Sequence, residues 1–486
     1  MSIFEKKQWT GTEHQTPTPK IEVFLPSNTS SSEPDYTFLP DIGAGAWSKL
    51  LNYSFTESVE DLDGSFSFTT ENGIIGEGQN GQSVFDIILK RSVIKIYEGG
   101  NLPAFIGIIR RRRISKQKTS QGIKRTIIFS GKSIISCIVE YTVSLDVKIQ
   151  GVADAISKQK ELTIKLSEAK TIKEFMIIAW KYYQEISESA GISTTGLAEI
   201  INRHIGNGDP ETFIDVKGSE QNLRYNIACI LFNAGNNVIA DVWRNILPKN
   251  AYEIFCQCEN GEPKIVARQV PFGDPENDYE DWKNLDLYVI SPVSLTGYDL
   301  DQNDENVYTA FASYIIGSPM SREFYMAVNQ TGNDSTVAYN DEKMRIYGYK
   351  PMLITFNGYN RQGNTDGEKT DATTKAVQKL NELASYWYSR NDDMYSGIIT
   401  TCTDFRNPEM NPRIGCRAKF LGGEFYIKKT DHAWTYGGTP TIKLSVSRGM
   451  MYDENGKMRD GEDGIIKGVG RQFRELERDA AIGATA

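Results

Sequence analysis

Gly131-Lys132-Ser133, in the stretch "FSGKS", is the first pattern whose residue types suit chemistry. A phosphate-binding P-loop ends in these three residues, because its lysine reaches the outer phosphates and its hydroxyl holds magnesium. That loop also needs a glycine five positions before the second glycine, and Thr126 stands there. The bulky or β-branched residues at 127–129 favour a strand. We therefore predict that Gly131 breaks a strand before a short helix, and that no cofactor binds here.

Clustered carboxylates form the second pattern, at 58–64, 273–282 and 298–306. A glycosidase needs two carboxyl groups ~5–9 Å apart in space, which such clusters can supply. The last cluster lacks the residue spacing, central glycine and distal glutamate of a calcium loop. In a chain with 63 acidic residues we interpret all three as solvated acidic loops, and a glycosidase remains the alternative.

The histidines and cysteines give little support for a catalytic or metal-binding site. The three histidines, at 14, 204 and 432, form no HExxH motif, and no GxSxG motif is present. Cys256 and Cys258 would share a face of a strand, but no partner ligands accompany them. The other cysteines are scattered, which is typical of a reducing cytoplasm. We predict no catalytic residue and no metal site.

The run "RRRR" at 110–113 is the strongest basic feature. Successive side chains of a strand point to opposite faces, so Arg110 and Arg112 are separated from Arg111 and Arg113. We name Arg110 and Arg112 as candidate partner contacts. The alternative is a solvated edge strand that its charge protects from aggregation.

Composition limits the function classes. The 486 residues carry a net charge of −9 and a pI near 5.2, so the general electrostatic footprint of a protein that binds DNA or anionic membrane is missing. No apolar run approaches the ~20 residues that span a bilayer. We expect no sequence-specific nucleic acid and no membrane span.

The elements that position these residues begin with a β unit. Leu51, Tyr53 and Phe55 alternate with polar residues, as in a strand with one buried face. A short helix in "KSIISCIVEY" is expected to pack across one end of the unit. The five expected strands lie at 47–56, 65–69, 93–98, 104–113 and 123–130.

The middle of the chain is mixed. Thr171 and Glu174 have capping-box spacing at the start of a helix, and a second helix is predicted within 219–235. Strands follow in "AYEIFCQCENG" and "EPKIVARQV". A third helix places Leu383 and Trp387 on one face.

A second β unit is predicted toward the end of the chain, followed by a linker and a short terminal helix. That helix carries Phe473 and Leu476, which we name as candidate partner contacts because it is too short to be stable alone. The expected strands of the second unit lie at 306–315, 397–403, 414–421, 424–434 and 441–447.

The predicted fold class is α+β, mainly β, with two small antiparallel β-barrels and mixed α/β and helical insertions between them. The predicted division is an extended N-terminal arm (1–45), the first barrel (46–150), a helical or mixed insertion (151–250), strands leading into the second barrel (251–315), an α/β insertion with a helix at 371–390 (316–396), the remainder of the second barrel (397–450), and a linker with a docking helix (451–486).

Residues of both β units resemble the hub proteins of contractile phage tails and related injection systems, the late control protein D-like family. The first unit has "GSFSFTTE", "SVIKIY" and a strand that closes on Gly131 followed by a basic residue. The second ends in a strand with His432 and Trp434 and then in Arg448-Gly449. The resemblance spans roughly residues 46–450, and it identifies "FSGKS" as a barrel-closing corner rather than a phosphate loop.

The resemblance implies a structural, non-enzymatic hub of a tail baseplate. In such hubs three chains supply six similar β faces, so that a trimeric spike meets a hexameric tail tube. The implied partners are other copies in a homotrimer, a spike protein, a tail-tube or tube-initiator protein, the tape-measure protein and baseplate wedge components. The particle would assemble in the bacterial cytoplasm and become part of a virion or tail-like particle.

Two alternatives stay open. One is a cell-wall-degrading glycosidase or peptidase with its site within 151–390, and the other is the equivalent protein of a non-contractile tail. Under the hub interpretation, we expect the acidic balance of the chain to line a central channel and keep cargo from adhering.

Overall fold

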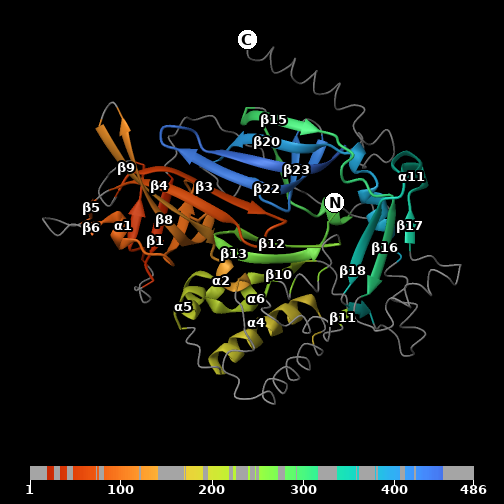
Figure 1. Cartoon of the computed structure of the whole chain (residues 1–486), viewed down its shortest axis with the longest axis horizontal. Coiled ribbons are helices and arrows are strands. Elements are labelled where there is room, and N and C mark those ends of the chain that lie inside the picture. The colour runs from red at the N-terminus through yellow and green to blue at the C-terminus, as the bar shows by residue number, and fades with distance from the viewer. Residues whose placement is uncertain are drawn as a thin grey trace, which may run out of the picture.

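A computed structural model of the chain provides the architecture (Figure 1). The residues that it describes are 19–26, 33–40, 48–72, 74–75, 82–119, 122–140, 169, 171–189, 195–217, 223–225, 239–240, 243, 247, 251–271, 280–291, 293–315, 337–356, 358–360, 378, 381–404, 411–420 and 423–451.

The first β unit contains the five predicted strands. Its strands pair antiparallel in the order β3-β4-β9-β8-β7. Tyr53 and Phe55 on one strand, and Phe66 and Phe68 on the next, are buried between exposed or half-buried polar neighbours, as the alternation predicts. The bounds are β3 (Leu50–Ser58), β4 (Ser65–Glu71), β7 (Val93–Tyr97), β8 (Phe105–Thr119) and β9 (Gly122–Ser133).

Part of the predicted N-terminal arm belongs to this unit. β1 (Lys20–Phe24) pairs antiparallel with β7 and with β2 (Tyr36–Phe38). The side chains of Ile21, Val23 and Phe38 are fully buried. The prediction that residues 1–45 form an arm outside the unit is therefore wrong for these strands, because their apolar side chains complete its core.

The second β unit is built from six strands. β22 and β23 form its centre, and the exposed strand β15 is one edge of the sheet. The bounds are β14 (Leu287–Val289), β15 (Leu295–Asp301), β20 (Ser396–Cys402), β21 (Arg417–Phe420), β22 (Gly423–Thr435) and β23 (Thr441–Met451).

One predicted strand of the second unit lies elsewhere. β16 (Ala310–Ile315) forms a separate three-stranded sheet with β17 (Val337–Tyr339) and β18 (Pro351–Phe356). Its apolar side chain Phe311 packs in a separate small core with Met352. The assignment of 306–315 to the second unit is therefore wrong.

The two β units are one continuous sheet. β3 of the first unit pairs antiparallel with β22 of the second, and the resulting 13-stranded sheet runs in the order β15-β20-β23-β22-β3-β4-β9-β8-β7-β1-β2, with β21 and β14 branching from β22. None of the described sheets closes into a barrel. The structure thus confirms a mainly β fold with antiparallel sheets and does not confirm two separate barrels.

A helical layer lies below the first unit in Figure 1 and encloses a third core. The helix α4 (Ile172–Ser189) begins as predicted, because the Thr171 hydroxyl oxygen accepts a hydrogen bond of 3.1 Å from the amide of Glu174. The short helix α2 (Ser136–Val139) lies within this core, so it joins the first unit to the helices. The layer also contains α5 (Thr195–His204), η1 (Gly206–Gly208) and α6 (Pro210–Phe213).

The predicted strands of the middle region are confirmed as β12 (Tyr252–Glu259) and β13 (Glu262–Gln269), which form a sheet with β10 (Ile214–Lys217). The helix predicted within 219–235 is wrong at β11 (Leu223–Tyr225), a strand that pairs with β19 (Gly358–Asn360), and its remainder lies outside the described residues. The third predicted helix is confirmed over 381–388. The remaining elements are β5 (Ile74–Ile75), β6 (Gln82–Ser83), α1 (Val84–Ile87), α9 (Glu280–Lys283), α11 (Asp341–Tyr347) and η3 (Asn391–Asp393).

Candidate functional site

The joint between β3 and β22 gives the sheet two continuous faces. On the inner face, aromatic side chains follow one another in register across the joint: Phe129 faces Phe68, Phe68 faces Tyr53, and Tyr53 faces Trp434. The ring centroids of Tyr53 and Trp434 are 5.9 Å apart and stacked. This row ties the strands of both units into one core at the joint.

The opposite face, which we call the outer face, carries mostly short side chains. Two registered rows of paired residues define it, and their members are exposed or half-buried. Charges of both signs lie on it, and Asp431 pairs with Lys429 at 3.0 Å. The first row is Ser130, Ser67, Ser54, Ala433, Thr441 and Cys402, and the second is Lys132, Ser65, Thr56, Asp431, Lys443 and Thr400.

Buried polar groups on the inner side of the sheet form hydrogen bonds across the joint. The carboxylate of Glu98, at the end of β7, lies 3.0 Å from the Nδ1 atom of His432 on β22. It also accepts hydrogen bonds from Tyr53 at 3.1 Å and from Asn411 at 3.3 Å. Glu98 is only 1% exposed. This acid and histidine are therefore closed to a substrate, and they serve to join the two units.

A second buried carboxylate lies near this group. Burial raises the pKa of Glu57 to about 7, against partial lowering by His432 and by the amide of Cys258. That amide donates a 3.0 Å hydrogen bond to Glu57 Oε1, so β3 is held to β12 at this point. Burial also raises the pKa of Cys258 well above its usual value, which keeps the thiol protonated.

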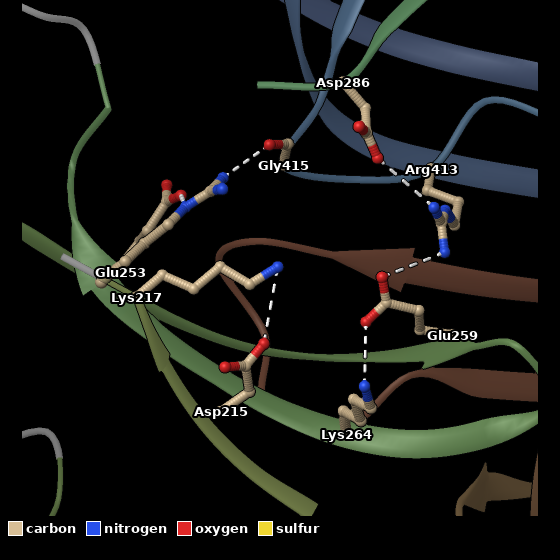
Figure 2. A network of polar contacts seen from close by, with 9 residues as sticks. Asp215, Lys217, Glu253, Glu259, Lys264, Asp286, Arg413 and Gly415 are labelled. Carbon is tan, nitrogen blue, oxygen red and sulfur yellow. Dashed lines mark hydrogen bonds and ion pairs between the residues drawn. The ribbon is translucent and has the colours of Figure 1, made fainter. Parts of the chain in front are cut away.

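A polar seam connects the second unit to the sheet β10-β13-β12 (Figure 2). Arg413 lies between the carboxylates of Glu259 and Asp286, at 3.5 and 3.4 Å. Glu259 also pairs with Lys264 at 3.2 Å. On the other side of the seam Lys217 pairs with Asp215 at 3.4 Å.

The buried part of the seam is centred on Arg268 of β13. Its guanidinium lies 2.6 Å from Glu253 and donates hydrogen bonds to the Gly415 carbonyl at 2.6 Å and to the Tyr426 hydroxyl at 3.1 Å. Gly415 has a φ of +72°, and a Cβ there would lie 2.7 Å from this guanidinium. Only glycine fits both demands, so the segment before β21 is fixed against β13.

The "FSGKS" segment is part of β9 and not a loop. Lys132 forms ion pairs with Asp63 and, at 2.7 Å, with Glu140. A Cβ on Gly131 would lie 1.9 Å from the carbonyl oxygen of Ile108, so glycine permits the close approach of β8. The prediction that Gly131 breaks the strand is wrong, because the strand continues to Ser133. The P-loop alternative fails because a paired strand cannot cradle a phosphate.

Arg110 and Arg112 contact their own chain. Arg110 donates to Ser136 at 3.0 Å and to Glu140 at 2.8 Å, and Arg112 donates to the carbonyls of Phe85 and Ile88 at 2.7 and 2.8 Å. Their role as partner contacts stays a prediction.

The exposed arginines of the run are Arg111 and Arg113, on the opposite face of the strand. The alternation of side chains along the strand correctly placed Arg110 and Arg112 on one face and Arg111 and Arg113 on the other. It did not say which pair faces the body of the protein, because that depends on the position of α1 and α2. Phe473 and Leu476, the other predicted contacts, lie outside the described residues.

The described part of the chain does not form the other kinds of site that the sequence was searched for. Among those residues no group of three or more histidine, cysteine or acidic side chains has the geometry of a metal site. Within the same ranges, no helix is long and apolar enough to cross a membrane. Burial lowers the pKa of His204 to about 3, and it lies against the Phe24 ring at a centroid distance of 5.0 Å.

Comparison with known proteins gives matches in structure alone. No model of a protein family and no curated protein matches the sequence. The fold is similar to the 43 kDa tail protein of prophage MuSo2 from Shewanella oneidensis, with a TM-score of 0.45, 10% identity and coverage of 89% of this chain and 98% of that one. It is also similar to a tail protein of Neisseria meningitidis MC58, with a TM-score of 0.43, 10% identity and coverage of 82% of this chain and 92% of that one. The fold is similar as well to prophage tail protein gp18 of Listeria monocytogenes EGD-e, with a TM-score of 0.39, 9% identity and coverage of 94% of this chain and 99% of that one.

Proposed function

We propose that the chain is a structural, non-enzymatic hub of a contractile tail baseplate, a member of the late control protein D-like family. Three copies form a ring that joins the hexameric tail tube to the trimeric spike and surrounds part of the central channel. Other copies, the spike and a tube or tube-initiator protein are its partners, with the tape-measure protein and wedge components as further contacts. The particle assembles in the bacterial cytoplasm.

One observation carries this proposal: the outer face runs without interruption across both β units. A wall that surrounds a channel needs a broad, continuous surface from each copy, and the pairing of β3 with β22 supplies one. Hydroxyl and methyl side chains such as Ser54, Ser67 and Ala433 present no long groups that would obstruct a passing polymer. Each copy contributes two β units to this surface, so three copies contribute six units, which suits a partner with six-fold symmetry.

The sequence predicted an acidic channel wall, whereas the outer face carries charges of both signs. The described charges of the outer face include the cations Lys132, Lys429, Lys443 and Arg111, which pairs with Ser130 of the first row, and the carboxylate of Asp431. Short hydroxyl and methyl side chains separate these charges, and Asp431 offsets part of the positive charge by pairing with Lys429.

The test is the mass of the purified full-length chain by sedimentation velocity, together with zymography on peptidoglycan. The proposal predicts a trimer and no clearing of the cell wall. A chain that stays monomeric at all concentrations, or one that clears peptidoglycan and loses that activity on mutation of one carboxylate, contradicts it.

A further inference from the structure

The sheet β17-β16-β18 and the helix α11 display apolar side chains that the chain itself does not use. Ten large apolar side chains are exposed among the described residues, and four of them lie between positions 339 and 353. Tyr339, Ile346, Tyr349 and Leu353 are 51%, 65%, 66% and 52% exposed, and we call them the apolar patch. Concentration of such residues on one small module marks an interaction surface.

One side of the sheet β17-β16-β18 is already packed against a small core, and the apolar patch is not part of that core. Phe311 and Met352 face each other across β16 and β18 and are buried in the small core below. On the other side, Ala310 is paired with Tyr339 and Ala312 with Leu353, and the two alanines are buried whereas their larger partners are exposed. The module therefore exposes Tyr339 and Leu353 at its edge strands, on the side opposite Phe311 and Met352.

Polar contacts, rather than burial, hold α11 in place. None of its residues is buried, yet Lys343 pairs with Asp392 at 2.5 Å and with Asp393 at 3.0 Å. The hydroxyl of Tyr347 donates to Asp392 at 2.8 Å. The helix thus presents Ile346 outward in a fixed position.

Negative charge surrounds the patch. Asp341 and Glu342 are exposed on α11, and the loop after β15 adds the exposed side chains of Asp304 and Glu305. This loop is held beside η3, because Gln302 donates a 3.0 Å hydrogen bond to the Asp393 carbonyl. The exposed cation of α11 is Arg345, so carboxylates outnumber cations around the apolar side chains.

The hairpin of β8 and β9 has the complementary character. Arg111, Arg113, Lys116 and Arg125 are exposed on it, with Arg111 and Arg113 on one face and Lys116, Arg125 and the 48% exposed Ile114 on the other. In Figure 1 the hairpin projects at one end of the long axis of the molecule, and α11 and β17 lie at the other end. The basic surface of a copy therefore cannot reach its own apolar patch.

We propose that the hairpin of one copy docks on the apolar patch of a second copy, with Arg111 and Arg113 facing Asp341 and Glu342. The contact is heterologous, and such contacts repeat head to tail until a ring closes. This inference rests on the proposed homotrimer and names the surfaces through which its copies meet. Complementary charge gives the contact its orientation, and the apolar side chains give it buried area.

Charge reversal tests the contact in the full-length chain. A hairpin variant carries Arg111→Glu and Arg113→Glu, and a patch variant carries Asp341→Lys and Glu342→Lys. Each is expected to weaken self-association roughly tenfold or more, as measured by sedimentation velocity at low salt. A single chain that carries all four substitutions is expected to recover association, because a reversed hairpin then meets a reversed patch at every contact of the ring.

The control variant carries Lys90→Glu and Lys181→Glu, which make the same change in net charge as the hairpin variant, at exposed positions outside both surfaces. It is expected to associate as the original chain does. Association that is unchanged in the hairpin and patch variants, or that the chain with all four substitutions fails to recover, overturns this contact and leaves the ring intact. A monomeric original chain overturns the ring itself.

Discussion

At the scale of single residues, the protein uses close contacts and buried polar groups to fix its strands. Gly131 permits β8 and β9 to approach where any Cβ would collide with the Ile108 carbonyl. The buried carboxylate of Glu98 binds His432 across the joint, and the buried carboxylate of Glu57 binds the Cys258 amide of β12. These residues determine the geometry on which the outer face depends.

Substitution of Gly131 tests the first of these contacts. Gly131→Ala places a Cβ 1.9 Å from a backbone oxygen, and we expect a loss of about 1–3 kcal/mol in stability from overpacking. Gly297→Ala on the edge strand β15 is the control, because a Cβ there meets nothing within 4 Å. Thermal unfolding of both variants distinguishes them, and equal midpoints would contradict the close-approach explanation.

Glu57 gives a prediction about pH. Its folded pKa of about 7 lies above the ordinary value of 4.5, so between these values the folded state binds more protons than the unfolded state. Stability from this group is complete at low pH and falls as pH rises toward 7, by up to about 1.4 kcal/mol per pH unit. Glu57→Gln keeps the acceptor for the Cys258 amide and removes the titration.

We therefore expect Glu57→Gln to become more stable relative to the original chain as the pH rises from 5 to 8. Urea unfolding at several pH values measures the difference. A difference that stays constant over this range would show that Glu57 does not change its protonation there.

At the scale of elements, alternation and capping predicted what depends on local sequence. The strands of the first unit were found because one face of each is buried and the other is not. The start of α4 was found because Thr171 and Glu174 are close in sequence. The pairing of β3 with β22 could not be predicted, since Thr56 and Asp431 are 375 positions apart and period-two alternation does not name a partner.

The same limit explains the errors. The strand at 310–315 has the same alternation as those of the second unit, and only the position of Phe311 in another core separates it from them. β11 lies within the segment that was predicted as a helix, but its pairing with β19 decides its conformation.

The helix cap of α4 can be tested directly. Thr171→Ala removes the hydroxyl oxygen that accepts from the amide of Glu174, and we expect a loss of about 1 kcal/mol. Thr171→Ser keeps the oxygen and is the matched control. Denaturant unfolding in which both variants behave alike would show that the cap contributes nothing.

At the scale of the whole molecule, a 13-stranded sheet, smaller sheets, several apolar cores and a polar seam combine into a body with distinct ends. The hairpin of β8 and β9 lies at one end of the long axis, and α11 and β17 lie at the other (Figure 1), where the proposed ring needs its two contact surfaces. The seam around Arg268 and Arg413 keeps the middle sheet fixed to the second unit, so that the arrangement is rigid (Figure 2).

Electron cryo-microscopy of the full-length assembled chain tests the central claim most directly. We predict a ring of three copies in which β3 and β22 of each copy border the central opening, with Ser54 and Ala433 facing it. A ring whose outer faces point away from the opening, or particles that contain single copies alone, would contradict the account.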